Sequence, residues 1–231
     1  MPVPAIGWRR RLPPLMALGL LMGLVFFANA PALAVAWEGR MDPLPQYRTY
    51  CQTYGARDPG CHISLGGQTD RLAGPDRIGG GGRTTLGMAA LVHRQVVGDL
   101  IYRTEAEDVW QILGSVGTGM EGDCDDVVMT TIARLVRRGF PRAALRATIV
   151  KLPGDGGHHL ILAVRMGKAG PKADPKADPK AEMYLDDRHR RPMRADQLVA
   201  QGYHFVAQEV PGEQYWRWAA RQPSTDLQTA G

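Results

Sequence analysis

Cys124, one of three cysteines in the 231-residue chain, stands where a nucleophile would be useful. It begins a segment, 124–138, whose apolar residues recur at the spacing of one helix face. Backbone N–H groups and the helix dipole at such an N-terminus stabilise a thiolate, the form of cysteine that attacks a carbonyl carbon. A buried cysteine with a purely structural role is the alternative interpretation of the same pattern.

A base able to deprotonate this thiol follows at the head of a predicted strand, residues 159–166. His158 and His159 come directly after a glycine-rich turn, and histidine is the side chain most often used for proton transfer. Because neighbouring side chains on a strand point to opposite faces, only one of the two imidazoles can face Cys124. The same divergence disfavours a zinc site built from the cysteine and both histidines.

An acid that could orient the imidazole is present farther along the chain. Asp186 and Asp187 stand at the end of the next predicted strand, 182–186. This strand would pair with the histidine strand as a hairpin, and cross-strand neighbours lie close enough to hydrogen bond. The order cysteine, histidine, aspartate therefore suits a nucleophile, a base and an orienting acid that meet in one site.

Hydrophobic periodicity predicts the elements that must bring these residues together. Two helices precede four strands, an order typical of α+β proteins with antiparallel sheets. Asp123 can serve as the N-cap of the second helix, and Gly139 stands where its left-handed C-terminal stop belongs. The predicted helices span 85–102 and 124–138, and the predicted strands span 145–152, 159–166, 182–186 and 204–210.

Three short motifs around the candidate residues resemble those of one enzyme family. They are Trp110 with the box Gly-Asp-Cys-Asp-Asp at 122–126, Gly-His-His-Leu-Ile-Leu at 157–162, and Leu-Asp-Asp at 185–187. In type and order these motifs resemble those of the bacterial transglutaminase-like cysteine proteinases, among them the LapG-like periplasmic peptidases. The resemblance extends over residues 88–210, with Asp125 in place of the usual glutamate and Asp187 in place of the usual asparagine.

The resemblance implies a papain-like, transglutaminase-like core in which a nucleophile helix packs on an antiparallel sheet. It assigns the nucleophile to Cys124, the base to His159 and the orienting acid to Asp186. As one of several aromatic residues, Trp110 is a candidate wall of the substrate cleft, and packing in the core or on the surface is the alternative interpretation of such aromatics. The implied enzyme is a cysteine endopeptidase that hydrolyses a peptide bond in a protein substrate, for example a surface adhesin. Transglutaminase-type acyl transfer and non-catalytic binding on the same fold are the alternatives.

Three acids flank the cysteine and oppose formation of the thiolate by like-charge repulsion. Asp123, Asp125 and Asp126 offer the carboxylate oxygens that calcium prefers, and the resemblance implies calcium at this box. The alternative is helix capping, since acids are favourable in the first turn of a helix. The thiol chemistry itself requires no cofactor, so calcium is the one cofactor that the sequence suggests.

Residues 1–34 have the pattern of a secretory signal peptide. Three arginines precede an apolar run of 13 residues, 15–27, and Ala32-Leu33-Ala34 fits a cleavage site. The run is shorter than the about 20 residues that span a bilayer, so no stable membrane insertion is expected after cleavage. Cleavage removes three arginines and no acid, which lowers the formal net charge from +5 to +2 and argues against a nucleic-acid partner. We therefore expect a periplasmic or secreted protein.

The remaining segments frame the candidate domain. Cys51 and Cys61 enclose nine residues, and a disulfide between them is expected in an oxidising compartment. A glycine-rich linker follows them, and a PKAD-repeat loop is inserted at 168–181. The expected boundaries are 1–34 for the signal peptide, 35–84 for the N-terminal segment with its linker, 85–221 for the peptidase domain and 222–231 for the tail.

Overall fold

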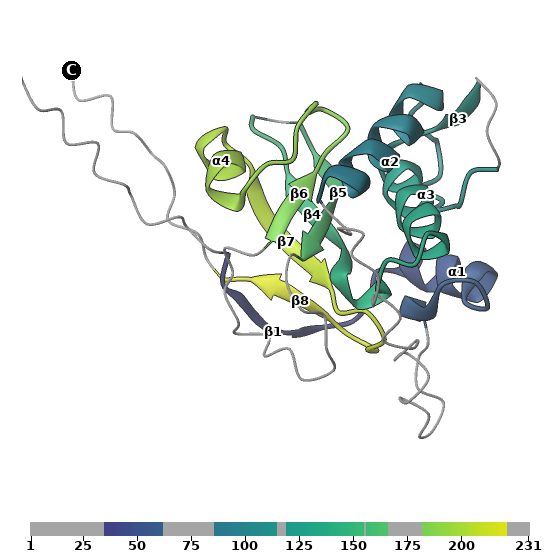
Figure 1. The fold of residues 1–231 in the computed structure, drawn as a ribbon. Helices are drawn as coiled ribbons and strands as arrows, with labels where there is room; N and C mark the ends of the chain where they lie inside the picture. Colours follow the sequence, from purple (N-terminus) through teal and green to yellow (C-terminus); the bar gives the residue numbers. More distant parts are fainter. Residues whose placement is uncertain (1–34, 62–85, 115–118, 155, 166–181, 221–231) are drawn as a thin grey trace, which may run out of the picture. The chain divides into compact units, whose positions relative to one another are not determined.

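The computed structural model describes residues 35–61, 86–114, 119–154, 156–165 and 182–220 (Figure 1). All of them belong to one compact unit, residues 32–231. The predicted signal peptide, the glycine-rich linker, the PKAD-repeat loop and the C-terminal tail lie outside the described residues. Among the helices that are described, none has the length and apolar character needed to cross a membrane.

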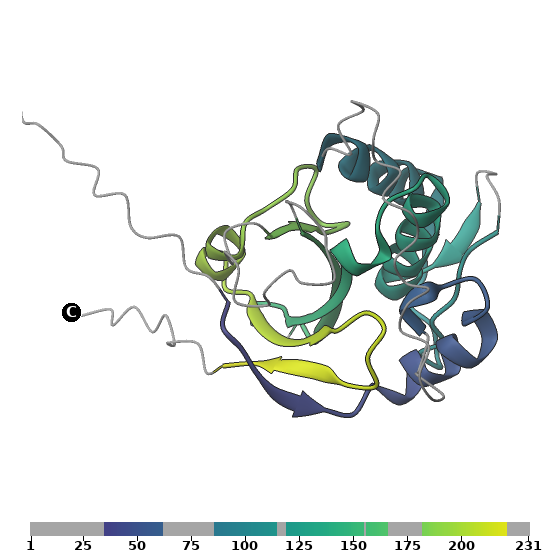
Figure 2. The same cartoon turned by 60° about the horizontal axis from the view of Figure 1, so that its bottom comes forward.

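Six strands form an antiparallel sheet in the order β1-β8-β7-β4-β5-β6, and Figure 2 shows them curving around one another. The pairing of β5 with β6 confirms the predicted hairpin partners. Two shorter strands, β2 and β3, pair in parallel. The strands are β1 (Trp37–Met41), β2 (Leu100–Tyr102), β3 (Met120–Gly122), β4 (Leu145–Lys151), β5 (His158–Arg165), β6 (Glu182–Leu185), β7 (His204–Glu209) and β8 (Trp216–Ala219).

Helices cover this sheet, and α3 packs against both β5 and α2 (Figure 1). The predicted α+β class, with the helix that begins at Cys124 packed on an antiparallel sheet, is therefore confirmed. The helices are α1 (Pro45–Tyr54), α2 (Leu86–Asp99), α3 (Cys124–Arg137) and α4 (Ala195–Ala200), with 3-10 turns η1 (Pro59–Cys61) and η3 (Arg142–Ala144).

Helix α3 forms and ends as its sequence predicts. Val128, Ile132 and Leu135 recur on one face and are buried, so apolar burial fixes the helix against the sheet. The helix ends before Gly139, whose φ of 87° is the left-handed conformation that glycine adopts without strain. There the N–H of Phe140 donates to the Leu135 carbonyl at 3.1 Å.

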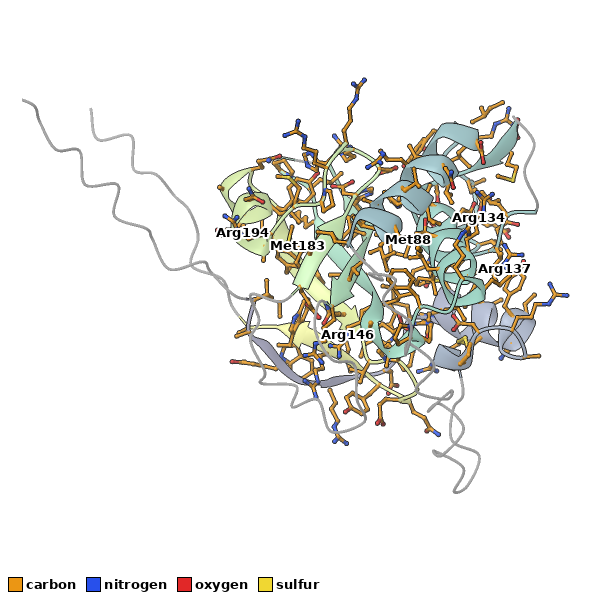
Figure 3. The ribbon with its side chains drawn as sticks, in the orientation of Figure 1. Met88, Arg134, Arg137, Arg146, Met183 and Arg194 are labelled. Atoms are coloured by element: carbon orange, nitrogen blue, oxygen red, sulfur yellow. A yellow bond between two sulfur atoms is a disulfide. The ribbon has the colours of Figure 1, made fainter. Side chains whose placement is uncertain are left out.

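Basic residues in the last turn of α3 project from the helix, as Figure 3 shows for Arg134 and Arg137. Arg134 Nη1 lies 3.4 Å from Oδ2 of Asp99, the last residue of α2. Cations near a helix C-terminus are favourable to its dipole. This contact also joins the far end of α3 to the end of α2.

The sheet separates two apolar clusters, which explains why the strands are mostly buried on both faces. Along β5, Leu160, Leu162 and Val164 belong to the cluster that includes α3, whereas Ile161 and Ala163 belong to a second cluster with α4. The strand therefore lies between helices on its two sides. Its first residues, where His159 stands, emerge at one end of this packed layer.

The N-terminal segment is fastened to the sheet by covalent and ionic contacts. The structure contains the predicted disulfide between Cys51 and Cys61. Within the loop that this bond closes, Asp58 Oδ1 accepts a hydrogen bond from Arg142 Nε at 2.6 Å. Glu209 of β7 contacts the same guanidinium, and all three charged side chains are buried. Burial would raise the pKa of Asp58, but the charge of Arg142 and the hydrogen bonds from Arg142, Gly60 and Tyr50 together lower it below its usual value.

Two expectations about the elements need correction. The helix predicted for 85–102 ends at Asp99, because Leu100 to Tyr102 pair with β3 as a strand. Ile101 and Tyr102 are exposed in this strand, so the apolar pattern that predicted a buried helix face there was misleading. The strands and α-helices that the sequence pattern does not predict, besides β2, are β1, α1, β3, α4 and β8.

Candidate active site

Cys124 is the first residue of α3 and the free cysteine of the chain, because Cys51 and Cys61 are joined. Gly122 ends β3, and Asp123 connects the strand to the helix with extended backbone, φ −131° and ψ −154°. Asp123 occupies the predicted N-cap position, but its side chain makes no capping hydrogen bond. The half-buried Cys124 side chain therefore sits beside backbone N–H groups that have no partner within the helix.

His159 is buried near the start of β5, whereas its neighbour His158 is exposed. Its Nε2 lies 2.9 Å from Asp186 Oδ1 and 3.2 Å from Asp187 Oδ1. A side-chain hydrogen bond also joins the His159 ring to Cys124. Because Nε2 faces the carboxylates, Nδ1 is the ring nitrogen left for the sulfur. The structure thus brings Cys124, His159 and Asp186 together in one chain of contacts.

The two carboxylates beside His159 are not equivalent. A ring nitrogen carries a single hydrogen, and the hydrogen bond goes to Asp186 Oδ1. Asp187 Oδ1 is buried and has no hydrogen-bond partner, although it lies within ion-pair distance of the ring. Asp186 therefore orients the imidazole, and Asp187 adds negative charge nearby.

The electrostatics of this pair favour charge separation. Burial alone would lower the pKa of His159, but its contacts with Asp186, Asp187 and Cys124 outweigh burial and raise the pKa to about 11. Burial would raise the pKa of Asp186, yet the hydrogen bond and charge of His159 lower it. At neutral pH the pair is an imidazolium and a carboxylate. An imidazolium in contact with a cysteine sulfur stabilises the thiolate.

Asp186 has further partners that the sequence did not identify. The hydroxyl of Tyr203 donates to Oδ2 at 2.9 Å, and the backbone N–H of Arg188 donates to Oδ1 at 2.9 Å. His189 Nε2 lies 3.3 Å from Tyr203 Oη. Tyr203 stands 17 residues beyond Asp186, after helix α4, so no local spacing pattern links the two.

A second buried histidine joins the helices to the same region. His93 of α2 has its Nδ1 3.4 Å from Thr131 Oγ1 of α3. Burial lowers the pKa of His93, although the charges of Asp187 and Asp186 oppose the change. His93 is therefore neutral at pH 7 and contributes packing, not charge, next to the orienting acid.

Asp125 and Asp126 are buried and Asp123 is half-buried, and no lysine or arginine of the described residues forms an ion pair with these acids. Asp126 Oδ1 accepts a hydrogen bond from the Gln111 N–H at 3.0 Å. One oxygen each of Asp123, Asp125 and Asp126 is buried with no hydrogen-bond partner. Burial, reinforced by Asp123, raises the pKa of Asp125 to about 10, and burial also raises the pKa of Asp126 to about 7.

Buried carboxylate oxygens without a hydrogen-bond partner are suitable ligands for a hard cation. Oxygens of Asp123 and Asp125 and the sulfur of Cys124 lie within 4.8 Å of one another. Carboxylate oxygens are the ligands that calcium prefers, so the donor set suits the predicted ion. Helix capping explains this cluster less well, since Asp123 makes no side-chain cap bond.

Trp110 is buried in an aromatic cluster. Its ring centroid lies 6.0 Å from that of Tyr47 and 6.1 Å from that of Trp216, and its Nε1 donates to Asp108 Oδ1 at 2.9 Å. These contacts give Trp110 a packing role between α1, β8 and the segment before β3. Its assignment to the wall of a substrate cleft stays a prediction.

A comparison with protein families supports the predicted resemblance. Residues 88–171 match the family model described as bacterial transglutaminase-like cysteine proteinase BTLCP. The matched range includes Cys124 and His159, whereas Asp186 lies beyond it. No curated protein matches the chain in sequence at a significant level.

Solved structures of LapG from Legionella pneumophila are similar to this chain. The calcium-bound form has a TM-score of 0.43 and 18% identity over 63% of this chain and 75% of that chain. The EGTA-treated form has a TM-score of 0.39 and 18% identity over 55% of this chain and 64% of that chain. A further LapG structure has a TM-score of 0.42 and 19% identity over 63% of this chain and 75% of that chain.

Proposed function

We propose that this chain, which matches the bacterial transglutaminase-like cysteine proteinases over residues 88–171, is an exported cysteine endopeptidase that uses Cys124, His159 and Asp186. The family is one of cysteine peptidases. The observation that carries the proposal is the line of contacts from the Cys124 side chain through His159 to Asp186 Oδ1. A nucleophile, a base and an orienter in hydrogen-bond contact are what covalent catalysis of acyl transfer requires.

The chemistry follows from these contacts. The Cys124 thiolate attacks the scissile carbonyl carbon, and the His159 imidazolium gives its proton to the leaving amine, so that a thioester and a free amine form. His159, now neutral, takes a proton from water, whose oxygen attacks the thioester and releases the acid product and the Cys124 thiolate, so that the imidazolium–thiolate pair is restored. Asp186 keeps the imidazole in one orientation through both steps.

The helix N-terminus supplies part of the stabilisation of the tetrahedral intermediate. The backbone N–H of Cys124 belongs to the first turn of α3, where N–H groups have no intrahelical acceptor. An oxyanion that forms on the carbonyl attacked by Cys124 lies close to this donor and to the positive end of the helix dipole. Removing one donor of this kind typically lowers kcat by about 100- to 1000-fold.

Calcium is the ion that the acidic cluster would hold. Asp123, Asp125 and Asp126 would be its ligands, because each has a buried oxygen that lacks a hydrogen-bond partner. When bound, the ion supplies positive charge that offsets the repulsion between these acids and the Cys124 thiolate. The residues Asp123 and Asp125 flank the nucleophile directly, so their neutralisation would also fix the start of α3.

The working compartment and the substrate belong to the same proposal. The pattern of residues 1–34 and the disulfide between Cys51 and Cys61 both favour a periplasmic or secreted protein. A protein segment exposed on the same cell surface, such as that of an adhesin, is then the accessible substrate.

The test compares the wild-type protein with Cys124→Ala on the exported surface proteins of the same cell, with calcium and with a chelator. We expect wild-type protein to generate new N-termini in at least one surface protein and the variant to generate none. Cross-linked or amidated products in place of two fragments would replace hydrolysis with acyl transfer. Identical protein patterns with both forms would leave a non-catalytic binding protein as the better account.

A further inference from the structure

The carboxylate of Asp186 is held by three donors from different parts of the fold. Oδ1 accepts hydrogen bonds from His159 Nε2 and from the backbone N–H of Arg188, both at 2.9 Å. Oδ2 accepts from the Tyr203 hydroxyl at 2.9 Å. The Asp186 side chain is 0% exposed, so water does not replace a donor that is lost. Among the described side chains, Tyr203 is the one that donates a hydrogen bond to Oδ2, and His189 Nε2 lies 3.7 Å from the same oxygen.

Tyr203 is itself fixed in position. It is 4% exposed and packs in the apolar cluster that includes α4, while its backbone N–H donates to the Leu198 carbonyl at 3.1 Å. The hydroxyl has one hydrogen, which goes to Asp186, so Oη accepts from His189 Nε2 at 3.3 Å. The rings of His189 and Tyr203 also lie 5.9 Å apart between centroids. A row of oriented donors thus runs from His189 through Tyr203 to Asp186.

We propose that Tyr203 is a positioning residue that holds the Asp186 carboxylate in the orientation in which Oδ1 accepts from His159. This inference rests on the proposed function, since it concerns the same cysteine, histidine and aspartate. Without the hydroxyl, Oδ2 would be a buried charged oxygen with no donor, which is costly. The carboxylate would turn toward another donor, and its support of the imidazolium next to Cys124 would weaken.

The test uses the rate at which iodoacetamide alkylates Cys124, the free thiol of the chain. We expect Tyr203→Phe to lower this rate about 10-fold near pH 6, the size expected for one charge-assisted hydrogen bond. The matched control is Tyr184→Phe, because Tyr184 is also buried and its hydroxyl also donates to a carboxylate, Glu182 Oε2 at 3.1 Å. The control should leave the rate unchanged although it loses a comparable bond.

Two further readouts separate positioning from a general loss of structure. The low-pH limb of the alkylation profile should move to higher pH in Tyr203→Phe and stay in place in Tyr184→Phe. In an Asp186→Asn background, Tyr203→Phe should cause no additional loss, because the residue through which it acts has been altered. Equal losses in the two backgrounds would overturn the inference.

A milder pair of variants keeps the proposal testable if Tyr203→Phe does not fold. His189→Leu removes the donor to Tyr203 Oη together with the 3.7 Å contact between the His189 ring and Asp186 Oδ2, and it should lower the rate about 2-fold. His189→Gln keeps an N–H at that place and should leave the rate near that of wild type. Equal alkylation rates for His189→Leu and His189→Gln would contradict the proposal. If wild-type Cys124 reacts no faster than an ordinary thiol, the proposed function fails. If wild-type Cys124 reacts fast and Cys124 in Tyr203→Phe reacts at the same rate, only the positioning role of Tyr203 fails.

Discussion

Two of the groups of buried carboxylates in this domain have different surroundings. Asp58 and Glu209 both contact the guanidinium of Arg142, so the negative charges that fasten the N-terminal segment have a cation between them. Asp125 and Asp126 have no such partner within the described part of the chain, and each keeps a buried oxygen without a hydrogen bond. The first group already contains its cation, whereas the second group has carboxylate oxygens available to bind one.

The pKa directions express the same difference. Burial would raise the pKa of Asp58, but the charge of Arg142 and the hydrogen bonds to this carboxylate together lower it, so the carboxylate is charged in the folded protein. The pKa values of Asp125 and Asp126 are raised by burial, so the folded protein without a bound cation favours their protonated forms. The comparison teaches that paired charges hold the N-terminal segment in place. The carboxylates without a partner lie next to Cys124, where the chemistry is proposed.

The largest expected effect comes from removing the cation of the first group. Arg142→Met leaves Asp58 and Glu209 buried without a partner and should lower the free energy of unfolding by about 3–5 kcal/mol. Urea unfolding measures this loss. Arg48→Met is the control, because the exposed pair of Arg48 with Asp42 at 3.2 Å should contribute less than about 1 kcal/mol. Similar losses in the two variants would refute the distinction.

Adding a cation to the second group should stabilise the protein. Calcium at 100 times its dissociation constant should raise the free energy of unfolding by about 2.7 kcal/mol, and a chelator should reverse the gain. Asp125→Asn should abolish the response because it removes a ligand charge. Asp99→Asn, which alters an acid paired with Arg134 at the far end of α3, should keep it. A response that persists in Asp125→Asn would place the ion elsewhere.

The two groups should also respond oppositely to pH. Asp126 has a folded pKa of about 7 against an ordinary value of 3.8, so the folded state binds the extra proton and stability falls as pH rises from 3.8 to about 7. Asp58 has a lowered pKa, so its contribution is lost as pH falls below 3.8.

Unfolding measured in chelator should show the first slope, on the order of 1 kcal/mol after discounting for solvent screening. Asp126→Asn should reduce the slope between pH 3.8 and about 7, and the part due to Asp125, whose folded pKa is raised to about 10, should remain. Saturating calcium should reduce the slope as well. A stability that rises with pH over this window in chelated wild-type protein would be the wrong sign for a buried, unpartnered carboxylate.

The smallest expected effect concerns the second carboxylate beside His159. Asp187 lies 3.2 Å from the ring but accepts no hydrogen bond, so Asp187→Asn should change the alkylation rate of Cys124 less than about 2-fold. Asp186→Asn should lower the same rate at least about 10-fold, since it alters the acceptor that orients the ring. If Asp187→Asn lowered the alkylation rate more than Asp186→Asn, Asp187 would be the acid that orients the ring.

Much of the site could be predicted because its residues begin or end regular elements. Cys124 opens a helix with clear periodicity, His159 follows a glycine turn into a strand, and the pairing of β5 with β6 follows from their order. Alternation predicts that only one of His158 and His159 faces inward, and the family resemblance assigns that place to His159. Its burial in the structure agrees with the assignment.

Other features depend on contacts between distant segments and had no local signal. Tyr203 reaches Asp186 only because α4 and the following turn fold back over β6, and Arg142 meets Asp58 across 84 positions of sequence. The sequence pattern predicts helix for Leu100–Tyr102, because a short apolar run next to a helix fits the helical period as well as the strand period. In contrast, Pro45 at the first turn of α1, with Tyr47 and Tyr50 buried behind it, was a helix signal available in the sequence.

The central claim is that His159 holds the sulfur of Cys124 as a reactive thiolate. The direct measurement is the rate of Cys124 alkylation by iodoacetamide near pH 6, compared between wild type and His159→Ala in calcium-containing buffer. An ordinary thiol is almost fully protonated at that pH, so wild type should react about 100-fold faster than the variant. Equal rates would show that the imidazole does not activate the sulfur and would contradict the account.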